Sequence, residues 1–157
     1  MSTLIQRTLP PLLAFSGAFL VIFSLALITR FSHLSVLFAP LGASAVLLFA
    51  VHESPLAQPR AIIGGHLVSA LVGFGLLHLM GNTPLAQGTA VGLSIALMML
   101  TRTLHPPAGA TPLVILQTAP PVEFLLSSLL PGTVLLVLLG VLYHRFAARR
   151  SYPKFWW

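Results

Sequence analysis

The feature that most constrains this chain is a set of long apolar stretches without a single Asp, Glu, Lys or Arg. The first, Leu12–Thr29, has 18 residues, enough to cross a hydrocarbon core of about 30 Å as a helix. Comparable stretches cover residues 61–80, 85–101 and 124–143. With 57% hydrophobic and 6% charged residues, the chain is too apolar for a soluble domain. We therefore expect an all-α, polytopic membrane protein.

Two further apolar stretches are broken by proline. Pro40 interrupts the stretch that ends at Val51, and Pro106 and Pro107 precede the short run Thr111–Thr118. Proline removes a backbone donor and disrupts a helix, and within lipid such a break is tolerated only where protein or water covers the freed backbone. The sequence thus predicts two short helices that begin inside the membrane, each after a proline break.

An offset of 67 residues relates the two breaks, which indicates an internal repeat. The offset superposes Pro40 on Pro107, Gly42 on Gly109, Ala43 on Ala110, Ser44 on Thr111 and Gly65 on Gly132. Each half then consists of a long helix, a broken short helix and a second long helix. We predict four full spans plus two short broken segments, all in one transmembrane domain. The domain is 1–157, with repeat 1 over about 12–80, repeat 2 over about 85–145 and a basic, aromatic tail over 146–157.

The course of the two short segments decides the topology, and two alternatives remain. If they cross completely, the halves are inverted, both termini share one side, and only Arg30 lies opposite the other basic residues. If they turn back, Arg30, Arg60 and Arg102 lie opposite the termini. The positive-inside bias favours crossing, whereas the shortness of the segments favours turning back. The tail aromatics are typical of an interfacial anchor: Tyr152, Phe155, Trp156 and Trp157.

A helix that begins inside a membrane suits an anion. Its first backbone N–H groups have no partner within the helix and carry the positive end of the helix dipole. Glycine permits close approach of a ligand, a hydroxyl can donate to it, and a histidine can carry a proton. We therefore predict a substrate site for a small anion at the two breaks, formed by Gly42, Ala43, Ser44, His105, Gly109, Ala110 and Thr111. The structural alternative is that both breaks only allow helices to cross closely.

Three other polar residues are assigned to a vestibule or to proton coupling: Arg60, His66 and Arg102. The arginines stand at segment ends, where they either attract anions or set the orientation in the membrane. His66 shares a helix face with Gly65, Ser69 and Gly73, and small residues at this spacing permit close helix packing. A hydrogen-bonded packing histidine is therefore the alternative interpretation of His66.

Composition excludes several functions. The chain has no cysteine and only two acidic residues, Glu53 and Glu123, which leaves no thiolate site and disfavours carboxylate catalysis or an all-oxygen cation site. We expect no enzyme activity and no cofactor. The net charge of +6 comes from residues at segment ends, which indicates membrane orientation and no nucleic-acid partner. Two alternatives to transport remain: a metal- or cation-handling protein that uses His66 and His105 with His52, and a membrane scaffold.

Four separated motifs, in order, resemble the HPP family of integral membrane proteins, which is named after its His-Pro-Pro motif. They are Ala39–Val46, Ser54–Arg60, Gly64–His66 and Arg102–Ala110, within a resemblance over about residues 12–145. The resemblance implies a bundle of four transmembrane helices, and nitrite transport is assigned to members in chloroplasts and cyanobacteria. The family's motif residues correspond here to Pro40, Gly42, Ala43, Ser44, Gln58, Pro59, Arg60, Gly65, His66, His105, Pro106, Pro107, Gly109 and Ala110.

From these observations we expect a transporter or channel for a small monovalent anion, with nitrite as the best candidate. A chain of 157 residues barely encloses a path by itself, so we expect a homo-oligomer. The expected partners are the inorganic anion and the lipid bilayer, and the expected location is a bacterial inner membrane.

Overall fold

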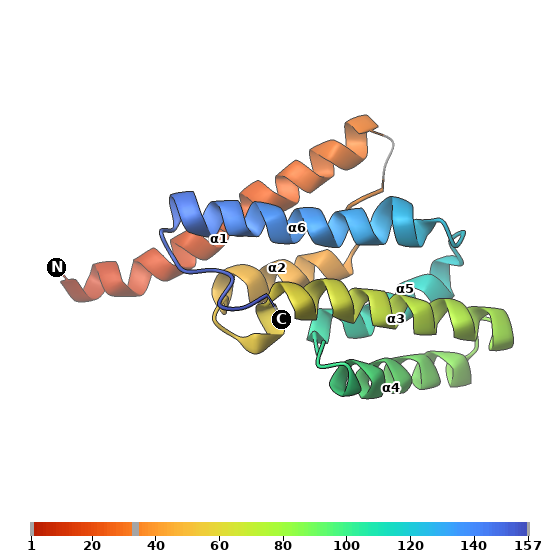
Figure 1. The fold of residues 1–157 in the computed structure, drawn as a ribbon. Helices are drawn as coiled ribbons and strands as arrows, with labels where there is room; N and C mark the ends of the chain where they lie inside the picture. Colours follow the sequence, from red (N-terminus) through yellow and green to blue (C-terminus); the bar gives the residue numbers. More distant parts are fainter. Residues whose placement is uncertain (1, 33–34, 157) are drawn as a thin grey trace.

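The computed structural model describes residues 2–32 and 35–156, and in these residues every regular element is a helix (Figure 1). The long helices are α1 (Ser2–Ser32), α3 (Pro59–Met80) and α6 (Leu130–Leu142). π-helical turns at both ends extend α6 to Leu125–Ala147. Among the described residues, three stretches are long and apolar enough to cross a membrane: Arg7–Ser32, Pro59–Met80 and Leu125–Ala147. The prediction of an all-helical protein with long apolar helices is confirmed.

The remaining helices are shorter. Helix α4 (Pro84–Leu100) has 17 residues, at the lower limit for a span. Helices α2 (Pro40–Ala50) and α5 (Thr111–Thr118) have 11 and 8 residues. The fourth full span and the internal repeat therefore stay predictions.

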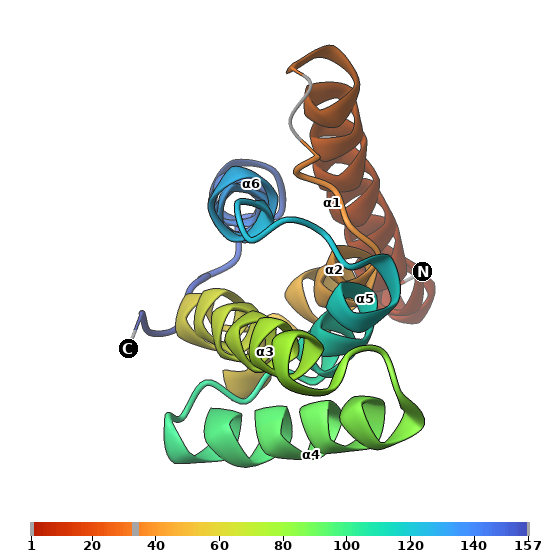
Figure 2. The ribbon, with the colours of Figure 1, turned by 90° about the vertical axis from the view of Figure 1, so that its right-hand side faces the viewer.

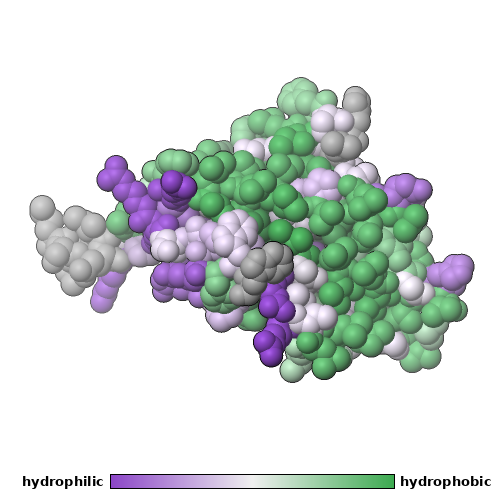
Figure 3. All heavy atoms as spheres, in the orientation of Figure 1, coloured by the Kyte–Doolittle hydropathy of each residue, from purple (hydrophilic) through white to green (hydrophobic). Residues whose placement is uncertain are grey.

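Consecutive helices run in opposite directions along the bundle, and neither α2 nor α5 turns back on itself (Figure 1). The start of α3, the end of α4 and the end of α6 lie at the end of the bundle that holds the C-terminal tail. Arg60 at the start of α3, Arg102 just after α4 and Arg145 near the end of the α6 stretch belong to this end. Hydrophilic residues gather at this end in Figure 3, whereas most of the remaining visible surface is apolar. This alternation agrees with the arrangement of six crossing segments.

Helix α3 occupies the middle of the bundle. It contacts α4, α5 and α6, as the view along the bundle shows (Figure 2). Gly65 of α3 packs against Thr103, and Gly73 packs against Pro112 and Ile115. The close packing expected of this small-residue face is therefore present. Helix α1 lies at the periphery, and the stacked rings of Phe15, Phe19 and Phe23 point outward from it, as expected of side chains in lipid.

The prolines of the two breaks begin helical turns and do not interrupt them. Pro40 is the first residue of α2, and Pro106 opens a 3₁₀ turn, Pro106–Ala110, that leads into α5. In a first turn the missing N–H would have had no partner, and the fixed φ of proline already suits the helix. The breaks thus give two short helices with defined starting points.

In the C-terminal tail, Tyr152 differs from the expected interfacial anchor, whereas Phe155 and Trp156 are exposed. Tyr152 is buried, and its hydroxyl donates to the Ala57 carbonyl at 2.9 Å. Lys154 forms an ion pair with Glu53 at 2.9 Å, and its backbone N–H donates to the Gln58 side chain at 2.8 Å. The tail is therefore tied to the loop between α2 and α3, which the sequence could not reveal because some 95 residues of chain separate the partners.

The tail should loosen at mildly acidic pH. The ring of His52 stacks on that of His144 with centroids 4.8 Å apart, and burial, followed by the charge of Arg150, lowers the pKa of His52 below its usual 6.5. Because the pKa of His52 is lower when the tail is docked on the loop between α2 and α3, the tail is held most tightly above pH 6.5. Its docking weakens as the pH falls through the lowered pKa of His52. Hydrogen exchange of the Lys154 amide should therefore accelerate between pH 7.5 and 5, after correction for the intrinsic rate.

A His52→Phe variant keeps an aromatic ring for stacking but removes the titration of His52, so its corrected exchange should depend on pH less than that of the unaltered protein. The ion pair does not confound this test. The hydrogen bond from Lys154 lowers the pKa of Glu53, so the carboxylate stays charged at pH 5. Equal pH dependence in both proteins would contradict the assignment to His52.

Candidate functional site

Two imidazoles lie between the N-terminal parts of the short helices α2 and α5. Ser44 in α2 is 3.0 Å from Nε2 of His66 and 2.8 Å from Nε2 of His105, measured from its Oγ. Nδ1 of His66 is 2.7 Å from Oγ1 of Thr111, the first residue of α5. Nδ1 of His105 is 2.7 Å from the Leu56 carbonyl oxygen. Five groups from α2, α3, α5 and two loops therefore form one continuous hydrogen-bonded chain, here called the imidazole chain.

The imidazole chain is sealed from the surroundings. Ser44, His66 and His105 have no exposed surface, and Thr111 is 1% exposed. Polar groups inside a low-dielectric region are costly unless each is paired. Here every side-chain nitrogen and oxygen of the four residues has a partner within hydrogen-bond distance.

With both histidines neutral, the proton positions along the imidazole chain are determined. The Leu56 carbonyl only accepts, so Nδ1 of His105 donates to it and Nε2 must accept from Ser44. Ser44 Oγ also lies 3.2 Å from the Pro40 carbonyl oxygen, but its single proton goes to the nearer Nε2 of His105, which otherwise has no donor. Nε2 of His66 therefore donates to Ser44 Oγ. Nδ1 of His66 consequently accepts from Thr111. All hydrogen bonds point from Thr111 toward Leu56.

Close glycine contacts hold the two breaks in place. A Cβ at Gly65 of α3 would lie 2.7 Å from the Thr103 carbonyl oxygen and 2.8 Å from Cβ of His105. A Cβ at Gly132 of α6 would collide with the Val36 carbonyl oxygen. Each break therefore depends on close approach of a long helix, and that helix belongs to the other predicted half of the chain.

These contacts follow the 67-residue offset. The offset relates Gly65 to Gly132, and it also relates Thr103, which Gly65 approaches, to Val36, which Gly132 approaches. A second pair behaves in the same way, because Gly73 packs against Ile115 while Gly140 packs against Leu48.

His66 lies between residues that the same offset relates. Its two ring nitrogens bind Ser44 and Thr111, which form one such pair. Its ring also makes edge contacts with Phe38 and His105, with centroids 5.6 and 5.2 Å apart, and these two residues are again 67 positions apart.

The predicted substrate-site residues divide into two groups. Ser44, His105 and Thr111 are brought together by His66 in the imidazole chain. The small residues Gly42, Ala43, Gly109 and Ala110 lie outside it and are exposed or half-buried. The amides expected to hold an anion are bonded within their own turns: Leu41 and Gly42 donate to Phe38 and Ala39, and Thr111 donates to Ala108.

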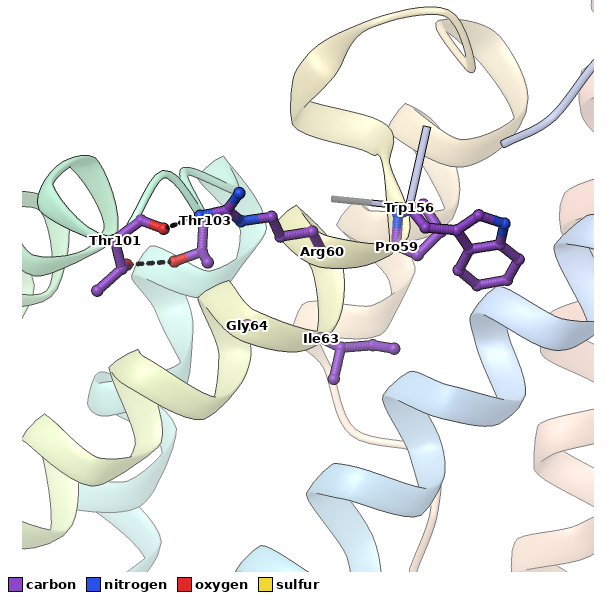
Figure 4. Close-up of a pocket in the computed structure, with 7 residues that line it drawn as sticks. All are labelled: Pro59, Arg60, Ile63, Gly64, Thr101, Thr103 and Trp156. Carbon is purple, nitrogen blue, oxygen red and sulfur yellow. Dashed lines mark hydrogen bonds between the residues drawn. The ribbon is translucent and has the colours of Figure 1, made fainter. Parts of the chain in front are cut away.

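Arg60 lines a cavity of about 610 Å³ at the start of α3 (Figure 4). Its guanidinium donates to the Thr101 carbonyl oxygen at 2.6 Å. Arg102 is exposed and does not line the cavity, so only one of the two predicted vestibule arginines is found there. Gly64 and Thr103 of the lining precede Gly65 and His105 in sequence, which places this cavity next to the His105 end of the imidazole chain.

The metal-binding alternative finds no support in the described residues. No group of three or more His, Asp or Glu side chains gathers there to hold a metal ion. His66 and His105 are adjacent, but His52 stacks on His144 instead of joining them.

The apolar helices, the alternating directions and the buried imidazole chain define the class: a polytopic helical membrane protein with two short helices that begin at its centre. The chain belongs to the HPP transmembrane family, whose model, described as the HPP transmembrane region, matches residues 6–153. The resemblance seen in the four motifs is thereby confirmed.

Two curated relatives are transmembrane proteins of Dictyostelium discoideum. One is 40% identical over 134 residues, which cover 80% of this chain and 47% of the relative. The other is 38% identical over 124 residues, which cover 74% of this chain and 40% of the relative. The chain thus spans about half the length of these relatives or less. No solved structure matches the chain.

Proposed function

We propose that this protein transports a small monovalent anion across a membrane and that nitrite is the substrate. The observation that carries the proposal is the imidazole chain, a fully buried row of two imidazoles and two hydroxyls where two short helices begin. Buried polar groups in membrane helices commonly mark an ion or proton pathway. Nitrite has a weak conjugate acid, so groups that donate hydrogen bonds and exchange protons suit it.

In this proposal the anion is bound mainly by side chains. Because the first amides of both short helices donate within their own turns, Ser44, His105 and Thr111 are the better donors. Hydrogen bonds to the anion then replace the hydrogen bonds that these residues make with His66 and with one another. Gly42, Ala43, Gly109 and Ala110 then lie on the approach to the site.

A carrier fits this geometry better than an open channel. The imidazole chain is enclosed by protein on all sides, and the close glycine contacts fix the helices around it. Opening it requires one set of helices to move against the other. Inverted repeats with broken helices at the midplane use such movements, and contacts related by the 67-residue offset support this arrangement here.

We further propose that protons move with the anion. A proton that enters at Thr111 can be relayed: the Thr111 proton passes to Nδ1 of His66, the Nε2 proton of His66 passes to Ser44, and the Ser44 proton passes to Nε2 of His105. Afterwards Nε2 of His105 donates to Ser44, Ser44 donates to Nε2 of His66, and Nδ1 of His66 donates to Thr111. One added proton thus reverses every hydrogen bond between His105 and Thr111. In the described residues, no charged side chain of α2, α3 or α5 bonds to the imidazole chain. The direction of its hydrogen bonds therefore depends on the protonation of the two histidines.

The remaining parts of the proposal rest on size and charge. We propose a homo-oligomer in a bacterial inner membrane, with the basic end of the bundle in the cytoplasm in accord with the positive-inside bias. Neither a metal-handling role nor a scaffold role has a specific contact in its favour.

Anion flux into proteoliposomes tests the function. Purified protein should accumulate nitrite faster than empty vesicles do, and an internal pH dye should report proton movement in the same direction. His105→Ala should reduce the flux to the background, because it removes the acceptor of Ser44 and the donor to Leu56.

Ser127→Ala is a suitable control, since this exposed hydroxyl bonds only locally to the Glu123 carbonyl and to Ser128. If nitrite, nitrate and formate all give background flux with the unaltered protein, the transport proposal is wrong. Flux of nitrite without any pH change would contradict the proton coupling alone.

A further inference from the structure

The cavity at Arg60 has a chemistry that the transport proposal does not use. It lies between the start of α3 and the end of α4, and its volume of about 610 Å³ is in the range of sites for organic ligands (Figure 4). Most of its lining is apolar, from Pro59, Ile63, Gly64 and the indole of Trp156. A hydrated inorganic anion gains nothing from such walls.

The guanidinium of Arg60 supplies the polar part of this cavity. A guanidinium has five N–H donors, and in the described structure one of them is used, for the Thr101 carbonyl oxygen. The hydroxyls of Thr101 and Thr103 bond to each other at 2.8 Å. No acidic side chain pairs with Arg60 in the described residues, and Glu53 pairs with Lys154. The cavity therefore presents an uncompensated positive group with free donors.

The position of the cavity matches the surface of a bilayer. Arg60 is the second residue of an apolar helix of 22 residues, so it lies where the span begins. Trp156 reaches the cavity from the C-terminal tail, and tryptophan is enriched at membrane interfaces. Basic residues surround this end of the bundle: Arg102, Arg145, Arg149, Arg150 and Lys154.

We propose that this cavity binds one anionic phospholipid from the surrounding leaflet. The lipid phosphate accepts hydrogen bonds from Arg60, and an acyl chain lies against Ile63, Gly64 and Trp156. Charge complementarity selects the anionic headgroup, and the apolar walls select a ligand with a hydrocarbon chain. This site is independent of the transport function, because none of its side chains belongs to the imidazole chain.

Quenching of Trp156 fluorescence tests the proposal. The chain has two tryptophans, so a Trp157→Phe variant leaves Trp156 as the single reporter. The variant is reconstituted in vesicles that contain increasing fractions of brominated phosphatidylglycerol or, separately, brominated phosphatidylcholine. Brominated phosphatidylglycerol should give half-maximal quenching at a mole fraction about fivefold lower, as expected for one basic side chain near a lipid surface.

Arg60→Gln should abolish this preference, because glutamine can still donate to Thr101 but carries no charge. Arg145→Gln makes the same change of net charge at an exposed residue outside the cavity and should retain the preference. Circular dichroism of both variants controls for folding. Equal quenching by the two lipids, or equal loss of preference in both variants, would overturn the proposal. Loss of the preference on adding inorganic phosphate at constant ionic strength would also overturn it, since it would indicate a site for a free anion.

Discussion

Replacing His66 with phenylalanine is expected to reduce anion flux to the level of empty vesicles while the protein still folds. Phenylalanine keeps the ring and its edge contacts with Phe38 and His105 but lacks both nitrogens. Thr111 then loses its partner, and Ser44 loses one of its partners. A buried hydroxyl without a partner costs about 1–3 kcal/mol, so unfolding in detergent should shift measurably without abolishing the transition. Initial uptake of nitrite in proteoliposomes is the measurement.

Thr133→Val is the matched control for His66→Phe. Thr133 is fully buried and stands 67 residues after His66, at the equivalent position of the other predicted half. Its hydroxyl donates only to the Leu130 carbonyl oxygen, one turn earlier in the same helix. Flux should therefore persist in this variant. Normal flux in His66→Phe, or an equal loss in both variants, would contradict a specific role of the imidazole chain.

The sequence predicted local structure where proline and hydropathy determine it. The run Thr111–Thr118 forms α5 with the expected bounds. Pro112 lies in its first turn, and Ala119, with φ 43°, ends it before Pro120. The long apolar stretches likewise form α1, α3 and the Leu125–Ala147 helix, because a membrane span needs little beyond length and hydrophobicity.

The sequence could not predict which polar groups meet. Ser44 and His105 are 61 residues apart, and the Leu56 carbonyl that fixes the tautomer of His105 is a backbone group that no motif marks. The small-residue face around His66 suggested packing as readily as proton coupling. Its central position becomes visible only when its two nitrogens are seen to bind one hydroxyl near the start of α2 and one at the start of α5.

The amides of the short helices illustrate a second limit. Sequence reasoning treats the first N–H groups of a helix as free, but the chain before α2 turns so that Phe38 and Ala39 accept from Leu41 and Gly42. The 3₁₀ turn before α5 acts similarly through Ala108. Such short turns depend on tertiary packing, and they move the role of anion donor from the backbone to the side chains.

Alanine at Gly132 or Gly65 is expected to destabilise the protein strongly. In both cases the new methyl group would meet a backbone carbonyl oxygen, of Val36 or of Thr103, which cannot move away as a flexible side chain can. Overpacking of this kind costs about 1–3 kcal/mol, or roughly 3–10 °C in the midpoint of thermal unfolding. Thermal unfolding in detergent is the measurement. Gly65→Ala should also lower flux, because its methyl group presses on Cβ of His105, 2.8 Å away.

Alanine at Gly42 or Gly109 is the contrasting pair, since nothing lies within 4 Å of a Cβ added at either position. Both variants should unfold at the normal temperature, so any change in flux reports on contact with the substrate. Reduced flux would place the anion against these glycines, whereas normal flux would leave Ser44, His105 and Thr111 as the binding groups. Normal stability of Gly65→Ala and Gly132→Ala would show that the helices have room to move apart. In that case the close contacts of α3 and α6 would not hold the two proline breaks in place, and that argument would fail.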